Sequence, residues 1–122
     1  MSRARTLAEK IIARCALSGG EALAPMDFAE VRPDFCYAHD YAVFAIDAFE
    51  RMGAHTVVRP ERNAACLDHV VPANTAREAN NHERVRRFAR EQGFAAFFEA
   101  GSGISHQVML EHQGATQRSS AL

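Results

Sequence analysis

Short apolar runs alternate with helix-forming segments along most of the chain, and this alternation limits the fold more than any other feature. Helices are predicted from a capping box at Thr6, after the N-cap residue Asp40, and from Thr75 to Gln92. Runs that fit short strands lie at residues 26–31, 35–38, 56–58, 64–67 and 95–98, and residues 104–110 fit a strand or a short helix. The pattern indicates an α/β fold: a partial three-layer α/β/α domain whose short-stranded sheet is mixed or parallel, with flanking helices.

Length and composition narrow the class further. The 122 residues suit one domain, with 48% apolar residues and a net charge of −1, which excludes a disordered chain and a general polyanion binder. We expect neither a membrane helix nor a signal peptide, because no apolar run is long enough. Three widely spaced cysteines give no disulfide framework, so a reducing, cytoplasmic setting is expected. Residues 112–122 are polar and aperiodic, and we expect this tail to be unstructured.

Polar side chains gather where the predicted strands end. In an α/β sheet, ligands bind beyond the carboxyl ends of the strands. Histidine is the side chain best suited to proton transfer near neutral pH. The candidate residues are His39, Asp40, Asp68, His69, Ser102 and His106.

Each candidate also has a purely structural interpretation. Asp40 suits the cap of the following helix, whose free amides equally suit an anionic substrate. Asp68 and His69 fit a solvated strand end, and His106 fits an ordinary core or surface histidine. The arginines between residues 84 and 90 indicate a solvated helix face, so no nucleic-acid partner is expected.

Six motifs in order along the chain resemble one family. They are TLAEKI at residues 6–11, HD at 39–40, PER at 60–62, DHVVPA at 68–73, RFA and a later glycine at 87–93, and FFEAGSGISHQ at 97–107. This series resembles the N-terminal part of the aconitase superfamily, and most closely the large subunit of 3-isopropylmalate dehydratase and homoaconitase. The resemblance assigns residues 1–111 to the N-terminal segment of an aconitase-type α/β/α domain.

The resemblance implies a hydro-lyase that removes water from, and returns it to, a hydroxy di- or tricarboxylic acid at a 4Fe-4S cluster. By the same resemblance, Asp68 orients His69, which handles the proton of the departing hydroxyl, and His106 is a second catalytic histidine. His39 and the Ser102 loop would bind substrate.

The chain also departs from the family pattern. Cys15, Cys36 and Cys66 do not match the cluster cysteines, and an Asp-Ser-His-Thr motif expected soon after His106 is missing. We therefore expect a truncated large subunit that holds no cluster and is inactive alone. Three alternatives stay open: completion by a partner chain, either a small subunit or the remainder of the large one; a non-catalytic dicarboxylate-binding module; and a mononuclear metal site built from His39, His69, His106 and a carboxylate.

Overall fold

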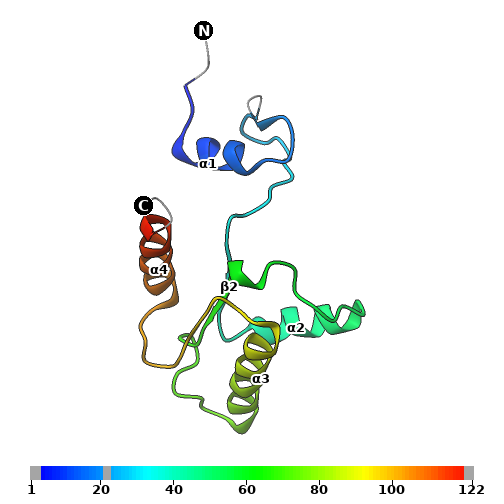
Figure 1. Ribbon diagram of the computed structural model, residues 1–122, viewed down its shortest axis with the longest axis vertical. Helices are drawn as coiled ribbons and strands as arrows, with labels where there is room; N and C mark the ends of the chain where they lie inside the picture. Colours follow the sequence, from blue (N-terminus) through cyan, green and yellow to red (C-terminus); the bar gives the residue numbers. More distant parts are fainter. Residues whose placement is uncertain (1–3, 21–22, 120–122) are drawn as a thin grey trace. The chain divides into compact units, whose positions relative to one another are not determined.

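The chain forms two compact units, Met1–Phe35 and Cys36–Leu122, in a computed structural model that describes residues 4–20 and 23–119 (Figure 1). The sequence predicted a single domain, with no linker dividing the chain. The first unit closes on itself because Val31 makes an isolated antiparallel bridge to Ala16, and the predicted strand at residues 26–31 does not form.

Helix α1, Leu7–Cys15, is the only α-helix of the first unit among the described residues. The predicted capping box is confirmed. Thr6 Oγ1 accepts a hydrogen bond from the Glu9 amide at 3.2 Å, and the Glu9 carboxylate accepts one from the Thr6 amide at 2.7 Å. These two bonds satisfy amides that would otherwise lack partners at the start of the helix.

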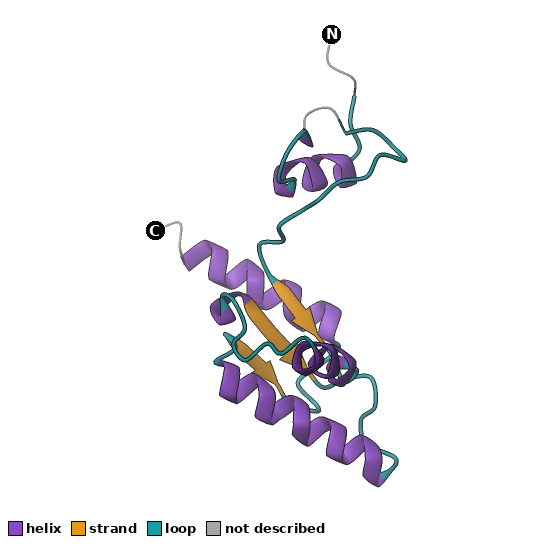
Figure 2. Cartoon of the chain, turned by 90° about the vertical axis from the view of Figure 1, so that its right-hand side faces the viewer, coloured by secondary structure: helices purple, strands orange, loops and turns teal. Residues whose placement is uncertain are grey.

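The second unit is built on a three-stranded parallel sheet. Strands β1 (Cys36–Ala38), β2 (Asn63–Cys66) and β3 (Ala96–Phe98) pair in the order β1-β2-β3, and Figure 2 shows them side by side. Both pairings are parallel, which decides between the mixed and parallel sheets that the sequence allowed. All strands therefore end at the same edge, where the candidate residues follow.

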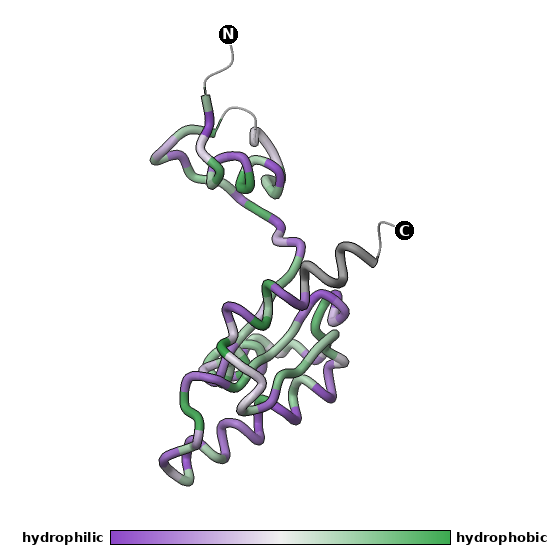
Figure 3. The backbone as a smooth tube through the Cα atoms, turned by 90° about the vertical axis from the view of Figure 1, so that its left-hand side faces the viewer, coloured by the Kyte–Doolittle hydropathy of each residue, from purple (hydrophilic) through white to green (hydrophobic). Residues whose placement is uncertain are grey.

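Helices cover both faces of this sheet. Helix α2 (Ala42–Arg51) and helix α3 (Ala76–Gln92) lie on one face and enclose a core of Val43, Ile46, Ala65, Leu67 and Val85. Helix α4 (Ser105–Ser119) lies on the other face, where His112 contacts the ring of Phe98. The strands are mostly green and α3 is largely purple in Figure 3, as expected for a buried sheet beneath an amphipathic helix.

Two further segments differ from the sequence analysis. Residues 56–58 form no strand, because the Val57 amide donates at 2.7 Å to Gln92 Oε1 at the end of α3, and Val58 lies 83% exposed. Residues 105–110 form the first part of helix α4, which continues to Ser119, so the described part of the tail that was expected to be unstructured is helical. No described helix combines the length and apolarity needed to cross a bilayer.

Candidate active site

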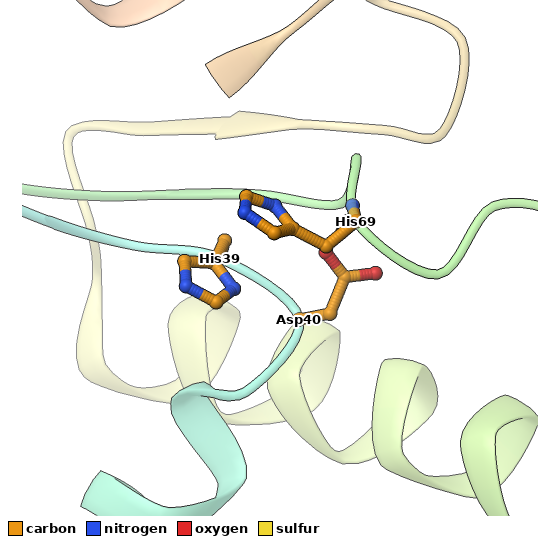
Figure 4. Close-up of side chains that lie close together, drawn as sticks. All are labelled: His39, Asp40 and His69. Carbon is orange, nitrogen blue, oxygen red and sulfur yellow. Dashed lines mark hydrogen bonds between the residues drawn. The ribbon is translucent and has the colours of Figure 1, made fainter. Parts of the chain in front are cut away.

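Three imidazoles gather at the carboxyl edge of the sheet, each following a different strand. His39 and His69 stack with ring centroids 3.9 Å apart and planes 13° from parallel (Figure 4). His106, in the first turn of α4, lies 6.4 Å from the His69 ring, and Tyr37 contacts it edge-on at 6.2 Å. The parallel sheet thus brings together residues that lie 67 positions apart in the sequence.

Asp40 is buried beneath the stacked rings, with 1% of its surface exposed. Its Oδ2 accepts hydrogen bonds from the amides of Asp68 at 2.9 Å and His69 at 2.8 Å, and its Oδ1 accepts one from Val70 at 3.3 Å. The expectation that Asp40 caps helix α2 is wrong: Tyr41 occupies the N-cap position and no side chain caps this helix. The carboxylate serves the loop after β2 instead, because three amides there would otherwise be buried without acceptors.

Asp68 joins the loop after β2 to the start of α4. Its Oδ1 lies 2.6 Å from Nδ1 of His69, and its Oδ2 accepts a hydrogen bond from the Ser105 amide at 2.7 Å. The second bond satisfies a free amide at the start of helix α4. It thereby fixes the start of helix α4 and, with it, the position of His106, the next residue along the chain.

These contacts give the two stacked rings opposite tautomers. A carboxylate only accepts hydrogen bonds, so the proton of neutral His69 lies on Nδ1, and Nε2 carries a free lone pair. Nδ1 of His39 instead accepts a long 3.4 Å hydrogen bond from the Tyr41 amide, which leaves the proton on Nε2. The pair therefore presents one proton acceptor beside one donor.

We expect Asp68→Asn to reverse the tautomer of His69. The Ser105 amide requires an acceptor, so the asparagine oxygen turns toward it and the NH2 group faces His69 Nδ1. Nδ1 must then accept, and the proton moves to Nε2. Long-range ¹H–¹⁵N spectra distinguish the two forms, and exposed His55 serves as the unchanged internal reference. An Nδ1-protonated ring in the variant would contradict this account of the site.

Both carboxyl groups are held ionised by their surroundings. Burial alone would raise the pKa of Asp40, but the amides of His69, Asp68 and Val70 lower it below its ordinary 3.8. Burial likewise opposes ionisation of Asp68, and its pKa is lowered by the Ser105 amide and the His69 ring.

Stability should therefore fall in acid. A carboxyl whose pKa is lower in the folded state stabilises the fold fully above its unfolded pKa, and this stabilisation disappears as pH falls through the folded value. Urea titrations at pH 7, 4 and 3 should show an unfolding free energy that is level near neutrality and decreases below about pH 4. Asp68→Asn should flatten part of that decrease, and an equal pH dependence in this variant would contradict the assignment.

Ser102 is the candidate that the structure does not join to the cluster. It is exposed, and its amide donates at 3.0 Å to the Glu99 carbonyl. The neighbouring Gly103 has φ of 130°, and a Cβ there would lie 2.8 Å from Val108 Cγ2. Glycine is thus needed for the turn into α4, whereas a role for Ser102 in binding stays a prediction.

His82 is the residue that the sequence analysis missed. It lies on α3, is 5% exposed, and places Nε2 2.8 Å from Asp40 Oδ1. Nε2 of His82 makes no hydrogen bond, so this is a close polar contact at ion-pair distance. The signal was present in the sequence, since His82 shares a helical stripe with buried Val85 and Ala89 at i+3 and i+7.

The site does not fit a mononuclear metal. His39, Asp40 and His69 offer ligand atoms within 4.8 Å of one another. However, a metal requires lone pairs that converge at about 2.0–2.2 Å, whereas nearly parallel stacked rings direct theirs side by side. The Asp40 oxygens are also already occupied by the loop amides and His82.

The described cysteines do not fit an iron–sulfur cluster either. Such a cluster is held by several convergent thiolates. Cys36 is exposed and pairs in register with Asn63, which places Cys66 roughly 10 Å further along the sheet. Burial, followed by the negative charges of Asp68 and Asp40, raises the pKa of the Cys66 thiol and opposes its thiolate form. Cys15 belongs to the other unit.

The imidazole cluster lies at an open surface. An apolar cavity of about 220 Å³ lies between the strands and helices α2 and α3, but none of the three histidines lines it. His106 is exposed, and the His69 side chain is 37% exposed. The fold and the site together define an α/β unit whose sheet edge carries proton donors and acceptors.

Comparison with known proteins identifies the family to which this α/β unit is similar. The chain is 38% identical over 108 residues to 3-isopropylmalate dehydratase large subunit 1 of Pyrococcus furiosus and 33% identical over 108 residues to that of Methanopyrus kandleri, covering 87% and 88% of the chain. It is 34% identical over 107 residues to the mitochondrial homoaconitase of Mycosarcoma maydis, covering 86% of the chain and 14% of that protein. No protein-family model matches the chain.

The chain belongs to the aconitase superfamily, in the branch of these dehydratase and homoaconitase large subunits. It spans about 25% of the length of the two dehydratase relatives.

Proposed function

We propose that this sequence forms the part of a dehydratase of the 3-isopropylmalate type that presents histidines to a hydroxy di- or tricarboxylic acid. The observation that carries the proposal is the stacked His39–His69 pair, whose rings have opposite tautomers and rest on two ionised carboxylates. Reversible dehydration needs a group that gives a proton to the departing hydroxyl and takes it back, and donors for the substrate carboxylates; we assign the first role to His69 and the second to His39.

The tautomers assign a role to each ring. In the dehydration direction the protonated His69 ring, whose positive charge Asp68 stabilises, gives its Nε2 proton to the departing hydroxyl, which leaves as water; in the reverse direction the Nε2 of the neutral ring takes that proton back. The Nε2–H of His39 donates to a substrate carboxylate. His106 is proposed as the second catalytic histidine and the Ser102 loop as part of the binding cleft, while buried Asp40 acts through the loop rather than on the ligand.

The remaining machinery is proposed to come from other polypeptide. In this family a 4Fe-4S cluster supplies Lewis-acid chemistry, and the described cysteines of this chain do not suit it. Large side chains stay exposed near this edge: Tyr41, against His39, at 47%, Phe44, against Tyr41, at 67%, and Ile104, two residues before His106, at 69%. They suit coverage by the rest of a large subunit or by a small subunit. Free cysteines favour a reducing cytoplasm.

Binding by the 122-residue chain itself is the direct test. In a titration with 3-isopropylmalate followed by NMR, the ring signals of His39, His69 and His106 should shift together, and His55 should not move. Citrate and malate in parallel titrations identify the preferred acid. Uniform small shifts across all histidines would contradict a ligand site at the sheet edge.

Turnover requires the assembled enzyme. Anaerobic iron–sulfide reconstitution of the chain alone should give no dehydration of 3-isopropylmalate. A chimera in which this chain replaces the 108 matched residues of the Pyrococcus furiosus large subunit, expressed with the small subunit, should dehydrate it. A folded chimera that carries the cluster and shows no turnover would contradict the proposed function. A chimera that carries the cluster and binds 3-isopropylmalate without turnover would favour the non-catalytic dicarboxylate module.

A further inference from the structure

The carboxylate of Asp40 is held unevenly by its four contacts. Its Oδ2 receives two short hydrogen bonds from the loop after β2, whereas the only hydrogen bond described at Oδ1 is a long one of 3.3 Å from the Val70 amide. The nearest group to Oδ1 is Nε2 of His82 at 2.8 Å. Both side chains are nearly inaccessible to water, at 6% and 1% exposed. His82 is therefore the closest polar neighbour of Oδ1 in surroundings that exclude water.

Helix α3 fixes the position of His82. Two residues further on, Arg84 contacts Asp47 at 2.6 Å and Glu50 at 2.7 Å on helix α2. Arg86 binds both carboxylate oxygens of Glu99, just after β3, at 2.7 and 2.9 Å. These ion pairs join helix α3 to helix α2 and to the residue that follows β3. The position of the His82 ring is therefore determined by the packed helices and sheet, and not by the loop of residues 68–70.

We propose that His82 and Asp40 form a buried positioning pair that holds the peptide of residues 68–70, and through it the His69 ring, against His39. The inference rests on the proposed role of His69. Nε2 of His82 lies 2.8 Å from a carboxylate oxygen outside hydrogen-bond geometry, so the contact acts by electrostatic attraction, which requires the ring proton on Nε2 because a bare lone pair there would repel Oδ1. The Oδ1 oxygen is then held toward α3, and Oδ2 stays aligned on the amides of Asp68 and His69. The pair touches no ligand and acts only through the loop.

Three substitutions separate positioning from plain stability. His82→Leu keeps the volume and removes the N–H. His82→Gln keeps an N–H near the same place. Val85→Ala, one turn along the same helix and 2% exposed, removes core contacts without touching the pair.

The readouts are amide hydrogen exchange at residues 69 and 70 and the His69 ring tautomer, both in the ¹⁵N-labelled chain without substrate. Exchange is normalised to the Leu67 amide, which bonds to the Phe98 carbonyl at 3.0 Å and reports the sheet. His82→Leu should speed normalised exchange at least about tenfold and mix the tautomers of His69. Val85→Ala and His82→Gln should both stay within about threefold of the unsubstituted chain.

His82→Leu that behaves like Val85→Ala overturns the proposal. Should that variant not fold, the unsubstituted chain still decides, because a His82 ring with its proton on Nδ1 rather than Nε2 contradicts the pair directly. These readouts need neither substrate nor cluster. Failure of the positioning pair is therefore distinguishable from failure of the dehydratase chimera.

Discussion

Asp40→Ala should lower the free energy of unfolding of the second unit by about 3–5 kcal/mol, as expected when one partner of a buried charged contact is removed. The substitution leaves the amides of Asp68, His69 and Val70 without their acceptor, and it leaves Nε2 of His82 buried beside a void. A small domain is stabilised by only about 5–15 kcal/mol, so the loss is a large part of the total. Urea unfolding followed by circular dichroism at pH 7 measures it.

The matched control is Asp47→Ala. Asp47 also contacts a helix α3 side chain, Arg84 at 2.6 Å, but its side chain is 45% exposed. Such a solvated pair contributes up to about 1 kcal/mol. Equal effects of the two substitutions would show that burial of Asp40 contributes nothing special, and the account of the site would fail.

The second large effect is expected on turnover. His69→Gln in the dehydratase chimera should reduce kcat by about 10²–10⁴-fold, the usual contribution of a positioned acid or base, while KM changes little. Glutamine fills a similar space and offers an amide, but it cannot take up a proton. Initial rates of 3-isopropylmalate dehydration measure both constants.

His55→Gln is the control for this experiment. It is the same substitution, at an exposed loop residue that is not part of the histidine cluster. It should leave kcat within about twofold of the unsubstituted chimera. A His69→Gln enzyme that retains most of its turnover would rule out His69 as the proton-transferring group, although the fold and the histidine cluster would stand.

The helices were predictable where their signals are local. The capping box at Thr6 and Glu9 and the helix after Thr75 depend on residues three positions apart, and both form as expected. Asp40 shows the limit of the same reasoning. It has the right type and place for an N-cap, but three amides from a segment 28–30 residues further along compete for its carboxylate and bind it.

The candidate site was predictable in part. Ligands bind beyond the carboxyl ends of parallel strands, and this rule singled out His39, His69 and His106 as candidates. The structure brings their three rings together. It does not bring Ser102 into contact with them. His82 was missed because a histidine in a polar helix is ordinary until its helical face is known to be buried.

By itself, the sequence determined helices α1, α2 and α3, the three strands that pair in the sheet, and the imidazoles and carboxylates that follow those strands. These properties depend on neighbouring residues and on the periodicity of apolar side chains. Only the tertiary structure decided that Asp40 supports a distant loop, that His82 contacts it, and that two histidines stack with opposite tautomers. Each of these depends on which donor and acceptor the packed sheet and helices bring within about 3 Å, and no local pattern encodes that distance.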